Sequence, residues 1–433
     1  MVKIYSSSSS GYFIEKSYKI LQKKENCDIE IDSSISYQVC YGFGGAITDS
    51  VAFNYSLLNE KQKKELIENV FSKEGLNYSL IRLPIGSCDF STSMYDYLEN
   101  GIFSLEHDLK GIIPMIKEVE KIKKLKIFAS PWSPPKIYKS NNSRTHGGKL
   151  LDEHYEDYAK YLVNYLLMMK KEDINIDYIS LQNEPLATQI WDSCIYSEKE
   201  EAALLSLVYS LIQKEDINTK IFIWDHNKDV IVNRVKETIN EKNNHMIEGI
   251  AYHWYDDFCN SNLSKVHELY EDKLLFFTEG CIELLLLDNN NPSSHIGRFE
   301  NGLRYAKNYI LDSENYSNAF IDWNILLDEK GGPNHVGNYC EAPIMYDRNK
   351  KELIYNPSYY VISHFSKFID PLDKRIKTKV FNDFIIATSY QKYDNKCVCV
   401  LLNSGNKGIY KIKLNEMVIE VELDSNSITT IIF

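Results

Sequence analysis

The sequence predicts an α/β fold, a (β/α)8 or TIM barrel, with a small antiparallel β-sandwich domain built from both termini. Between about residues 41 and 370, short runs rich in Ile, Val, Leu and Phe alternate with longer amphipathic segments rich in Lys and Glu. Both ends of the chain instead alternate apolar and polar residues with period two. A chain of 433 residues fits one large domain and one small one. We therefore expect the barrel at residues 41–370 and the side domain at residues 1–40 and 371–433.

Eight apolar runs are candidates for the barrel strands. They lie at residues 41–47, 78–85, 125–132, 176–185, 220–227, 248–255, 273–280 and 318–324. Amphipathic helices are expected between them, for example at 60–75, 157–172 and 198–215. An open doubly wound sheet would also alternate strands and helices, but it would normally include a glycine-rich phosphate loop. GFGGA (42–46) lacks the G-x-G-x-x-G spacing and the acidic residue after the next strand, so the barrel is favoured.

The side domain is predicted from terminal segments that alternate with period two. They lie at residues 25–38, 381–391, 396–414 and 417–433. No catalytic residue types cluster in them, so we expect their role to be structural. The serine run at 6–10 is the one low-complexity tract that we identify.

Composition and charge narrow the function classes. The chain has 49 basic and 61 acidic residues, a formal net charge of -12, so we expect no non-specific binding to nucleic acid or to anionic membranes. The ten histidines show no H-x-x-x-H or paired spacing, and no pair of C-x-x-C motifs has zinc spacing, so we expect no metal and no cofactor.

The cysteines and the N-terminus bear on the compartment. Nine cysteines are scattered, and the closest pair, Cys397 and Cys399, lies in a strand pattern, which favours reduced thiols and a reducing compartment. We find no apolar run of signal-peptide length and no segment long enough to span a bilayer. We therefore expect a cytoplasmic protein, or one released without a standard signal peptide.

Chemically active residue types gather where the predicted strands end. In a TIM barrel these ends meet at one face, where active sites form. Two glutamates, Glu184 and Glu279, end the fourth and seventh predicted strands, on opposite sides of one pocket. Hydrolysis of a glycosidic bond needs two carboxyl groups, one to protonate the leaving oxygen and one to attack or to activate water. Glycoside hydrolysis is therefore the reaction that this pair indicates.

Long motifs, in order, resemble glycoside hydrolase family 30, and specifically its glucosylceramidase branch. The resemblance covers about residues 41 to 368. The motifs are YGFGGAITDS (41–50), YSLIRLPIGSCDFS (78–91), ASPWSPPKIYK (129–139), LQNEP (181–185), IAYHWYDDF (250–258), FFTEGC (276–281) and DWNILLDEKGGPNHVGNYCEAPI (322–344).

The resemblance implies a role for each matching position. Glu184 matches the acid/base and Glu279 the nucleophile of a retaining mechanism, and the pKa of Glu184 is then expected above its ordinary value because the nucleophile is ionised. Residues expected to bind the substrate are Asp89, Trp132, Asn183, His253, Tyr255, Trp323 and Asn338. Trp132 and Trp323 can flank the sugar ring, although both could be core residues.

Arg82 lies in an apolar strand and needs a carboxylate partner there. The resemblance places it near Glu279, where it would keep that carboxyl group ionised. A purely structural ion pair is the alternative. His253 and Tyr255 share one face of a strand by the period-two rule, and the resemblance places them near the nucleophile; both could also be ordinary core residues.

The expected function is that of a retaining β-glycosidase acting on glucosylceramide or a related β-glucoside, so the partner is a β-glucoside or glycosphingolipid. Alternatives are a β-xylosidase, a β-fucosidase, a β-1,6-glucanase or a non-catalytic sugar-binding barrel. The loops at 186–197 and 282–294 differ from those of the animal lysosomal enzymes, so the aglycone stays open. Leu284–Leu287 could form an apolar lip for a lipid tail, but we expect the start of a buried helix.

Overall fold

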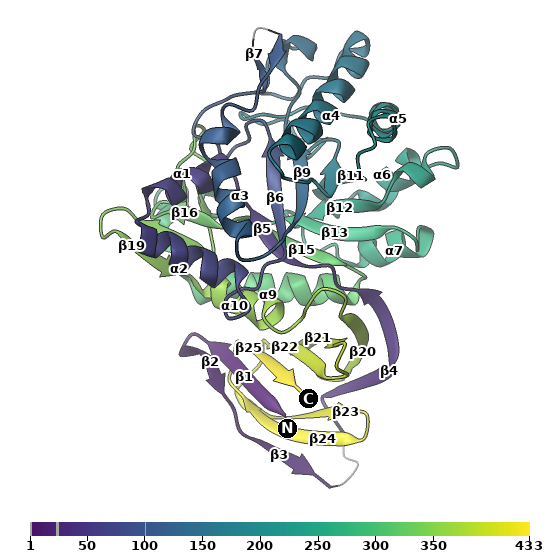
Figure 1. The fold of residues 1–433 in the computed structure, drawn as a ribbon. Coiled ribbons are helices and arrows are strands. Elements are labelled where there is room, and N and C mark those ends of the chain that lie inside the picture. The colour runs from purple at the N-terminus through teal and green to yellow at the C-terminus, as the bar shows by residue number, and fades with distance from the viewer. Residues whose placement is uncertain (1, 23–25, 100) are drawn as a thin grey trace.

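The computed structural model describes residues 2–22, 26–99 and 101–433. It confirms a closed barrel of parallel strands and a separate sheet domain formed by the two ends of the chain (Figure 1). Each barrel strand lies within one of the eight predicted runs. In spatial order around the barrel they are β10 (Tyr178–Ser180), β11 (Lys220–Asn227), β12 (Gly249–His253), β13 (Leu274–Glu279), β15 (Ala319–Asn324), β5 (Gly42–Ala46), β6 (Leu80–Ile85) and β9 (Lys126–Pro131).

Helices surround the barrel, and the three predicted ones are confirmed as α2, α4 and α5. The α-helices are α1 (Asp49–Leu57), α2 (Glu60–Phe71), α3 (Ile112–Glu120), α4 (Tyr155–Lys171), α5 (Glu198–Lys214), α6 (Ile231–Thr238), α7 (Ser261–Leu269), α8 (Leu284–Leu287), α9 (Phe299–Glu314) and α10 (Pro357–Ser366). Single 3-10 turns lie at Asp108–Lys110, Lys136–Tyr138, Asp152–His154, Asn244–Met246 and Pro292–His295. Capping boxes begin α2, at Asn59 and Gln62, and α5, at Ser197 and Glu200.

The barrel interior changes from apolar to polar along the strands. Every second side chain of a strand points inward. The lower interior cluster is largely apolar and aromatic and includes Leu80, Phe128, Tyr178, Phe222, Ala251 and Phe276. Two residues further along five of these strands, the buried residues are polar: Arg82, Ser130, Ser180, His253 and Thr278. The strands therefore present a polar layer beneath the face where their ends meet.

Strand β11 departs from this alternation. Its register against β12 shifts between Trp224 and His226, and both Trp224 (φ 75°) and Asp225 (φ 59°) adopt left-handed backbone conformations. A simple alternation from Phe222 would point Trp224 inward. The bulge instead leaves Trp224 in the outer core and brings the Asp225 carboxylate into the polar layer.

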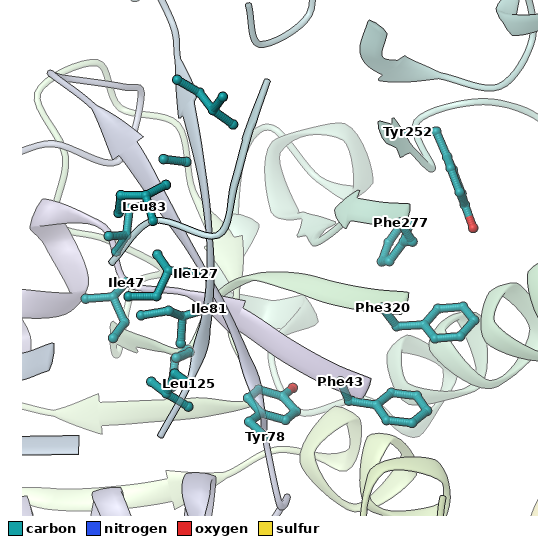
Figure 2. Close-up of a cluster of buried hydrophobic side chains, with 14 of the residues drawn as sticks. Phe43, Ile47, Tyr78, Ile81, Leu83, Leu125, Ile127, Tyr252, Phe277 and Phe320 are labelled. Atoms are coloured by element: carbon teal, nitrogen blue, oxygen red, sulfur yellow. The ribbon is translucent and has the colours of Figure 1, made fainter. Parts of the chain in front are cut away.

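The outer faces of the strands pack against the helices in the largest core cluster. Figure 2 shows part of it, with the rings of Phe43, Phe277 and Phe320 close together. The glycines of the GFGGA segment allow tight packing here: a Cβ at Gly44 would lie 2.1 Å from the Leu80 carbonyl oxygen on the neighbouring strand. Close packing between strands therefore explains the glycines of this segment, which needs no phosphate-binding role.

The terminal strands form one continuous sheet below the barrel, and both ends of the chain lie in it (Figure 1). In spatial order they are β2 (Gly11–Glu15), β1 (Lys3–Ser8), β25 (Ser427–Ile432), β22 (Cys397–Asn403), β21 (Ile385–Gln391), β20 (Lys374–Val380), β4 (Ile29–Val39), β23 (Gly408–Leu414), β24 (Met417–Leu423) and β3 (Tyr18–Leu21). The pairs are antiparallel except β4 with β23, which is parallel. The sheet encloses a core of its own, and α9 and α10 separate it from the barrel. The serine run forms part of a strand, since Ser6–Ser8 are buried in β1.

Short strands complete the face above the barrel. They are β7 (Leu98–Glu99) with β8 (Ile102–Phe103), β14 (Ile282–Glu283) with β17 (Cys340–Glu341), and β16 (Leu326–Asp328) with β18 (Ile344–Asp347) and β19 (Glu352–Tyr355). Cys40, Cys88, Cys194, Cys259, Cys281, Cys340, Cys397 and Cys399 are free thiols. Among the described helices, none combines the length and apolar character that crossing a bilayer requires.

Candidate active site

A pocket of about 300 Å³ opens where the barrel strands end. Of the predicted site residues, it brings together Asp89, Trp132, Asn183, Glu184, Tyr255, Glu279, Trp323 and Asn338. Arg82 and His253 lie in the polar layer beneath them, fully buried. A larger hollow of about 580 Å³ lies between α1, α2 and α3, but lysines at its rim are paired with glutamates of the same helices. The chemically active residue types therefore gather in the barrel pocket.

Arg82 joins the carboxylates beneath the pocket. Its Nη1 donates to Glu279 Oε2 at 2.5 Å, and its Nη2 donates to Asp225 Oδ2 at 2.9 Å and to Asn183 Oδ1 at 2.8 Å. Its Nε donates to Ser130 Oγ at 3.2 Å. The predicted contact between Arg82 and Glu279 is therefore present, and the buried guanidinium has hydrogen-bond acceptors on every side.

Asp225 is the other centre of this network. Its Oδ2 accepts from the hydroxyls of Ser130 at 2.8 Å and Ser180 at 2.5 Å, and its Oδ1 accepts from the hydroxyl of Thr278 at 2.6 Å. Burial would raise the pKa of Asp225, but Arg82, His253 and the Ser180 hydroxyl hold it far below its usual range. Asp225 therefore carries a permanent negative charge within the polar layer.

Glu184 lies on a strained turn just after β10. It has a left-handed backbone conformation (φ 47°), and its N–H donates to the Asp225 carbonyl oxygen at 3.0 Å. Its Oε1 lies 3.2 Å from His253 Nδ1, while His253 Nε2 lies 3.1 Å from Asp225 Oδ1. His253 thus bridges Asp225 and Glu184. His253 is also the register partner of Glu279 on the neighbouring strand, so it lies beside both glutamates.

Glu279 ends β13 and is held from two sides. Besides Arg82, the Tyr255 hydroxyl donates to its Oε1 at 3.0 Å. Gly280 follows it, and a Cβ there would lie 2.5 Å from the Phe277 ring and 2.7 Å from Trp254. The glycine lets the chain turn away directly after the carboxylate. Behind Tyr255, Cys281 and Cys340 place their sulfur atoms 3.0 Å apart in the pocket wall.

The pKa values in this pocket are strongly shifted. Burial would lower the pKa of His253, but the carboxylates of Glu279, Asp225 and Glu184 outweigh it and raise the pKa to about 9. Burial would raise the pKa of Glu184, yet His226 and His253 bring it below its ordinary value. The pKa of Glu279 is raised, first by burial and also by Glu184, even though His253 and Arg82 oppose the shift.

The expectation that the pKa of Glu184 is raised is therefore wrong. No sequence pattern indicates that His226 and the cationic His253 lie beside this carboxyl group. Arg82 lowers the pKa of Glu279, as expected, but burial raises that pKa by more.

The remaining predicted residues line one side of the pocket. Asn338 Nδ2 donates to Asp89 Oδ2 at 2.9 Å, and burial raises the pKa of Asp89 well above its usual range. Trp132 and Trp323 stack on each other, with ring centroids 5.2 Å apart. They form one aromatic wall of the pocket.

Residues that sequence reasoning did not single out also line or support the pocket. They are Asp225, His226, Asn227, Gln189, Trp191, Cys281, Glu283 and Cys340. For Asp225 a signal was available, since a buried charge at the end of an apolar strand requires a partner, as for Arg82. Glu283 is a further carboxyl group of the pocket, and burial raises its pKa to about 7.

Comparison with known proteins identifies the family. The profile of the glycosyl hydrolase family 30 TIM-barrel domain matches residues 40–369. The chain belongs to glycosyl hydrolase family 30. It is therefore a glycoside hydrolase, as its two pocket glutamates indicate.

Individual family 30 relatives point to two substrate types. The chain is 27% identical to the lysosomal acid glucosylceramidase of Mus musculus, over 94% of this chain and 83% of that protein. Among solved structures, SrfJ from Salmonella typhimurium is 31% identical with a TM-score of 0.94, over 100% and 99% of the two chains. The endo-β1,6-glucanase BT3312 is 27% identical with a TM-score of 0.89, over 100% and 98%.

Proposed function

We propose that this family 30 enzyme is a retaining β-glucosidase whose substrate is glucosylceramide or a closely related β-glucoside. The observation that supports it most is the placement of Glu184 and Glu279 in one pocket, at the ends of β10 and β13. Glu279 is the nucleophile, since Arg82 and Tyr255 both donate to its carboxylate. Glu184 is the acid/base, which protonates the leaving oxygen and then activates water.

His253 is the proton source of this mechanism. The cationic imidazole is one hydrogen bond from Glu184, at 3.2 Å. The proton moves through that contact to Glu184 in concert with its transfer to the leaving oxygen, because the imidazolium holds it more strongly than the carboxylate does. Asp225, on the other side of the ring, stabilises the imidazolium and fixes its orientation.

The glycone contacts favour glucose. Asp89 and Asn338 offer a carboxylate and an amide to neighbouring sugar hydroxyls, and the wall of Trp132 and Trp323 offers an apolar surface to the ring. A sugar that lacks one of these hydroxyls leaves a buried polar group unpaired, at a cost of about 1–3 kcal/mol. Xylosides, which lack the hydroxymethyl group, are therefore expected to be poorer substrates, and so are galactosides, whose axial 4-hydroxyl is displaced from the position it has in glucose.

Exposed leucines near the pocket support a lipid aglycone. The expectation that Leu284–Leu287 start a buried helix is only partly met, because Leu284 is buried in α8 while Leu286 is 78% exposed and Leu287 is 47% exposed. Leu186, which follows Glu184 closely, is 47% exposed. These side chains provide apolar surface next to residues that line the pocket.

A β-1,6-glucanase is the second candidate. It is favoured by the similarity to BT3312, which extends over the whole chain. In that case the aglycone is a sugar, and Glu283, in the pocket wall, accepts hydrogen bonds from its hydroxyls.

A substrate panel separates these candidates. It contains aryl β-glucoside, xyloside, galactoside and fucoside, a β-1,6-linked glucose oligomer, and glucosylceramide in several detergents. We expect the highest kcat/KM among the aryl glycosides for the glucoside, and hydrolysis of glucosylceramide. Cleavage of the oligomer without glucosylceramide supports the glucanase, and preference for the xyloside contradicts the glycone argument.

The lipid argument has a matched control. Leu286→Ser is expected to lower kcat/KM for glucosylceramide but not for the aryl glucoside, because only the lipid reaches α8. Leu372 is also 78% exposed and lies beside the terminal sheet, so Leu372→Ser should leave both values unchanged. Equal effects of the two variants on glucosylceramide would refute a role for the α8 leucines.

A further inference from the structure

Three donor atoms from successive barrel strands face one another at the acid/base. Glu184, His226 and His253 each offer one ligand atom, and these atoms all lie within 4.8 Å of one another. Glu184 Oε1 is 3.2 Å from His253 Nδ1 and 3.6 Å from His226 Nδ1. Ligand atoms of a tetrahedral ion with bonds of about 2.1 Å lie about 3.4 Å apart, so the two separations from Glu184 fit a single ion.

Two independent features indicate that the nitrogen atoms are suited to a ligand. His226 Nδ1 is buried and has no hydrogen-bond partner within the described part of the chain. His253 is oriented by Asp225, which holds its Nε2 at 3.1 Å and leaves Nδ1 to face Glu184. A carboxylate on the far nitrogen is the usual support of a metal-binding histidine.

We propose that Glu184, His226 and His253 form a binding site for a divalent transition-metal ion, of the class of Zn²⁺ or Cu²⁺, and that the bound ion inhibits the enzyme. Two imidazoles and one carboxylate suit these ions, whereas Mg²⁺ and Ca²⁺ require more oxygen ligands. Glu184 and His226 line the pocket, so a fourth position is open to water or to a sugar hydroxyl.

The bound ion inhibits because it replaces the proton that Glu184 must donate. It lies between His253 Nδ1 and Glu184 Oε1, and the proton held there is released to solvent. The Glu184 carboxylate is then a metal ligand and cannot protonate the leaving oxygen. This inhibitory effect rests on the proposed function, whereas binding of the ion does not.

Binding is tested first, without substrate. The full-length protein is freed of metal by a chelator and titrated with Zn²⁺ in a non-coordinating buffer by calorimetry, and Co²⁺ is added separately to record its visible spectrum. We expect one equivalent of Zn²⁺ and a tetrahedral Co²⁺ spectrum. His226→Phe keeps a ring beside Trp224 but removes the nitrogen, and it should weaken binding by at least about tenfold. Glu184→Gln should weaken it as well.

His107 provides the matched control. Its Nε2 lies 2.9 Å from Asp49 Oδ1 and its ring stacks on Tyr95, so it is another histidine beside a carboxylate and an aromatic ring, outside the pocket. His107→Phe should retain the wild-type affinity. The proposal is overturned if no equivalent binds at millimolar Zn²⁺, if His226→Phe binds as tightly as wild type, or if His107→Phe loses the site.

Inhibition is tested second, with an aryl β-glucoside. Zn²⁺ should inhibit wild type in the concentration range in which it binds, and His226→Phe should need at least about ten times more. Site-specific binding without inhibition overturns the inhibitory part. If the metal-free protein binds Zn²⁺ with the expected variant pattern but hydrolyses no β-glycoside, the proposed function fails and the metal site stands.

Discussion

At the scale of single residues, the pocket contains more carboxyl groups than cations. Asp225 contacts Arg82 Nη2 and His253 Nε2, and Glu279 contacts Arg82 Nη1. Glu184 contacts the imidazolium of His253, which Asp225 contacts as well. Two chemically identical glutamates thereby acquire different environments, which is the physical basis for giving them different roles.

Replacing each glutamate by glutamine should separate these roles. Glu279→Gln should abolish turnover of every glycoside because no nucleophile remains. Glu184→Gln should lower kcat by about 10²–10⁴-fold for an alkyl glucoside, whose leaving group needs a proton, and far less for a dinitrophenyl glucoside. Added azide should restore turnover in Glu184→Gln and give a β-glycosyl azide. Similar losses in both variants on the dinitrophenyl substrate would mean that the roles are assigned wrongly.

At the scale of elements, the bulge in β11 positions Asp225 and His226. It is held from outside the barrel by Glu201 of α5, which is 1% exposed. Glu201 Oε1 accepts from the Trp224 N–H at 2.8 Å, and its Oε2 accepts from Arg234 of α6 at 2.8 Å. One buried carboxylate thus ties two helices to the strand that supplies the polar layer.

Glu201→Gln should therefore reduce both stability and activity. The amide cannot replace the charge beside buried Arg234, so the free energy of unfolding should fall by about 3 kcal/mol, as for other broken buried ion pairs. The kcat should fall too, since the bulge is loosened. Denaturant unfolding and steady-state kinetics measure the two effects.

Glu198 is the control for this prediction. It contacts the same Arg234 at 3.3 Å, but its side chain is 30% exposed, so Glu198→Gln should cost less than about 1 kcal/mol. Equal costs for the two variants would contradict the role given to Glu201.

At the scale of the whole molecule, the barrel and the terminal sheet are joined through buried polar contacts. His364 of α10 is fully buried, with Nε2 2.7 Å from Ser7 Oγ of β1 and Nδ1 2.8 Å from Thr430 Oγ1 of β25. Burial lowers its pKa to about 3. The folded state therefore holds this imidazole neutral, while the unfolded chain protonates it near its ordinary pKa of about 6.5.

Stability should consequently depend on pH through His364. Because the folded pKa is depressed, its contribution is complete above about pH 6.5 and is lost as the pH falls toward 3. By about pH 4 the wild type should have lost about 3 kcal/mol relative to His364→Gln, which does not titrate. Chemical unfolding of both proteins across this range measures the difference, and parallel curves would contradict the prediction.

The barrel was predictable from sequence because each buried strand is a compact apolar run and because two glutamates end two of these runs. Asp225 was missed because a bulge, which period-two reasoning does not show, turns its carboxylate into the polar layer. The serine run was missed as a strand because its hydroxyls are satisfied by partners distant in sequence, such as His364. The wrong pKa direction for Glu184 has the same origin, since His226 and His253 come from other strands.

Glu279 as the covalent nucleophile is the central claim, and trapping the glycosyl enzyme tests it most directly. A 2-deoxy-2-fluoro-β-glucosyl fluoride destabilises both transition states while its leaving group speeds the first step, so the intermediate accumulates. Proteolysis and mass spectrometry then locate the sugar. We predict a fluoroglucosyl ester on Glu279 and on no other residue. An ester on another carboxylate, or no ester in a preparation that hydrolyses β-glucosides with inversion, would contradict the account.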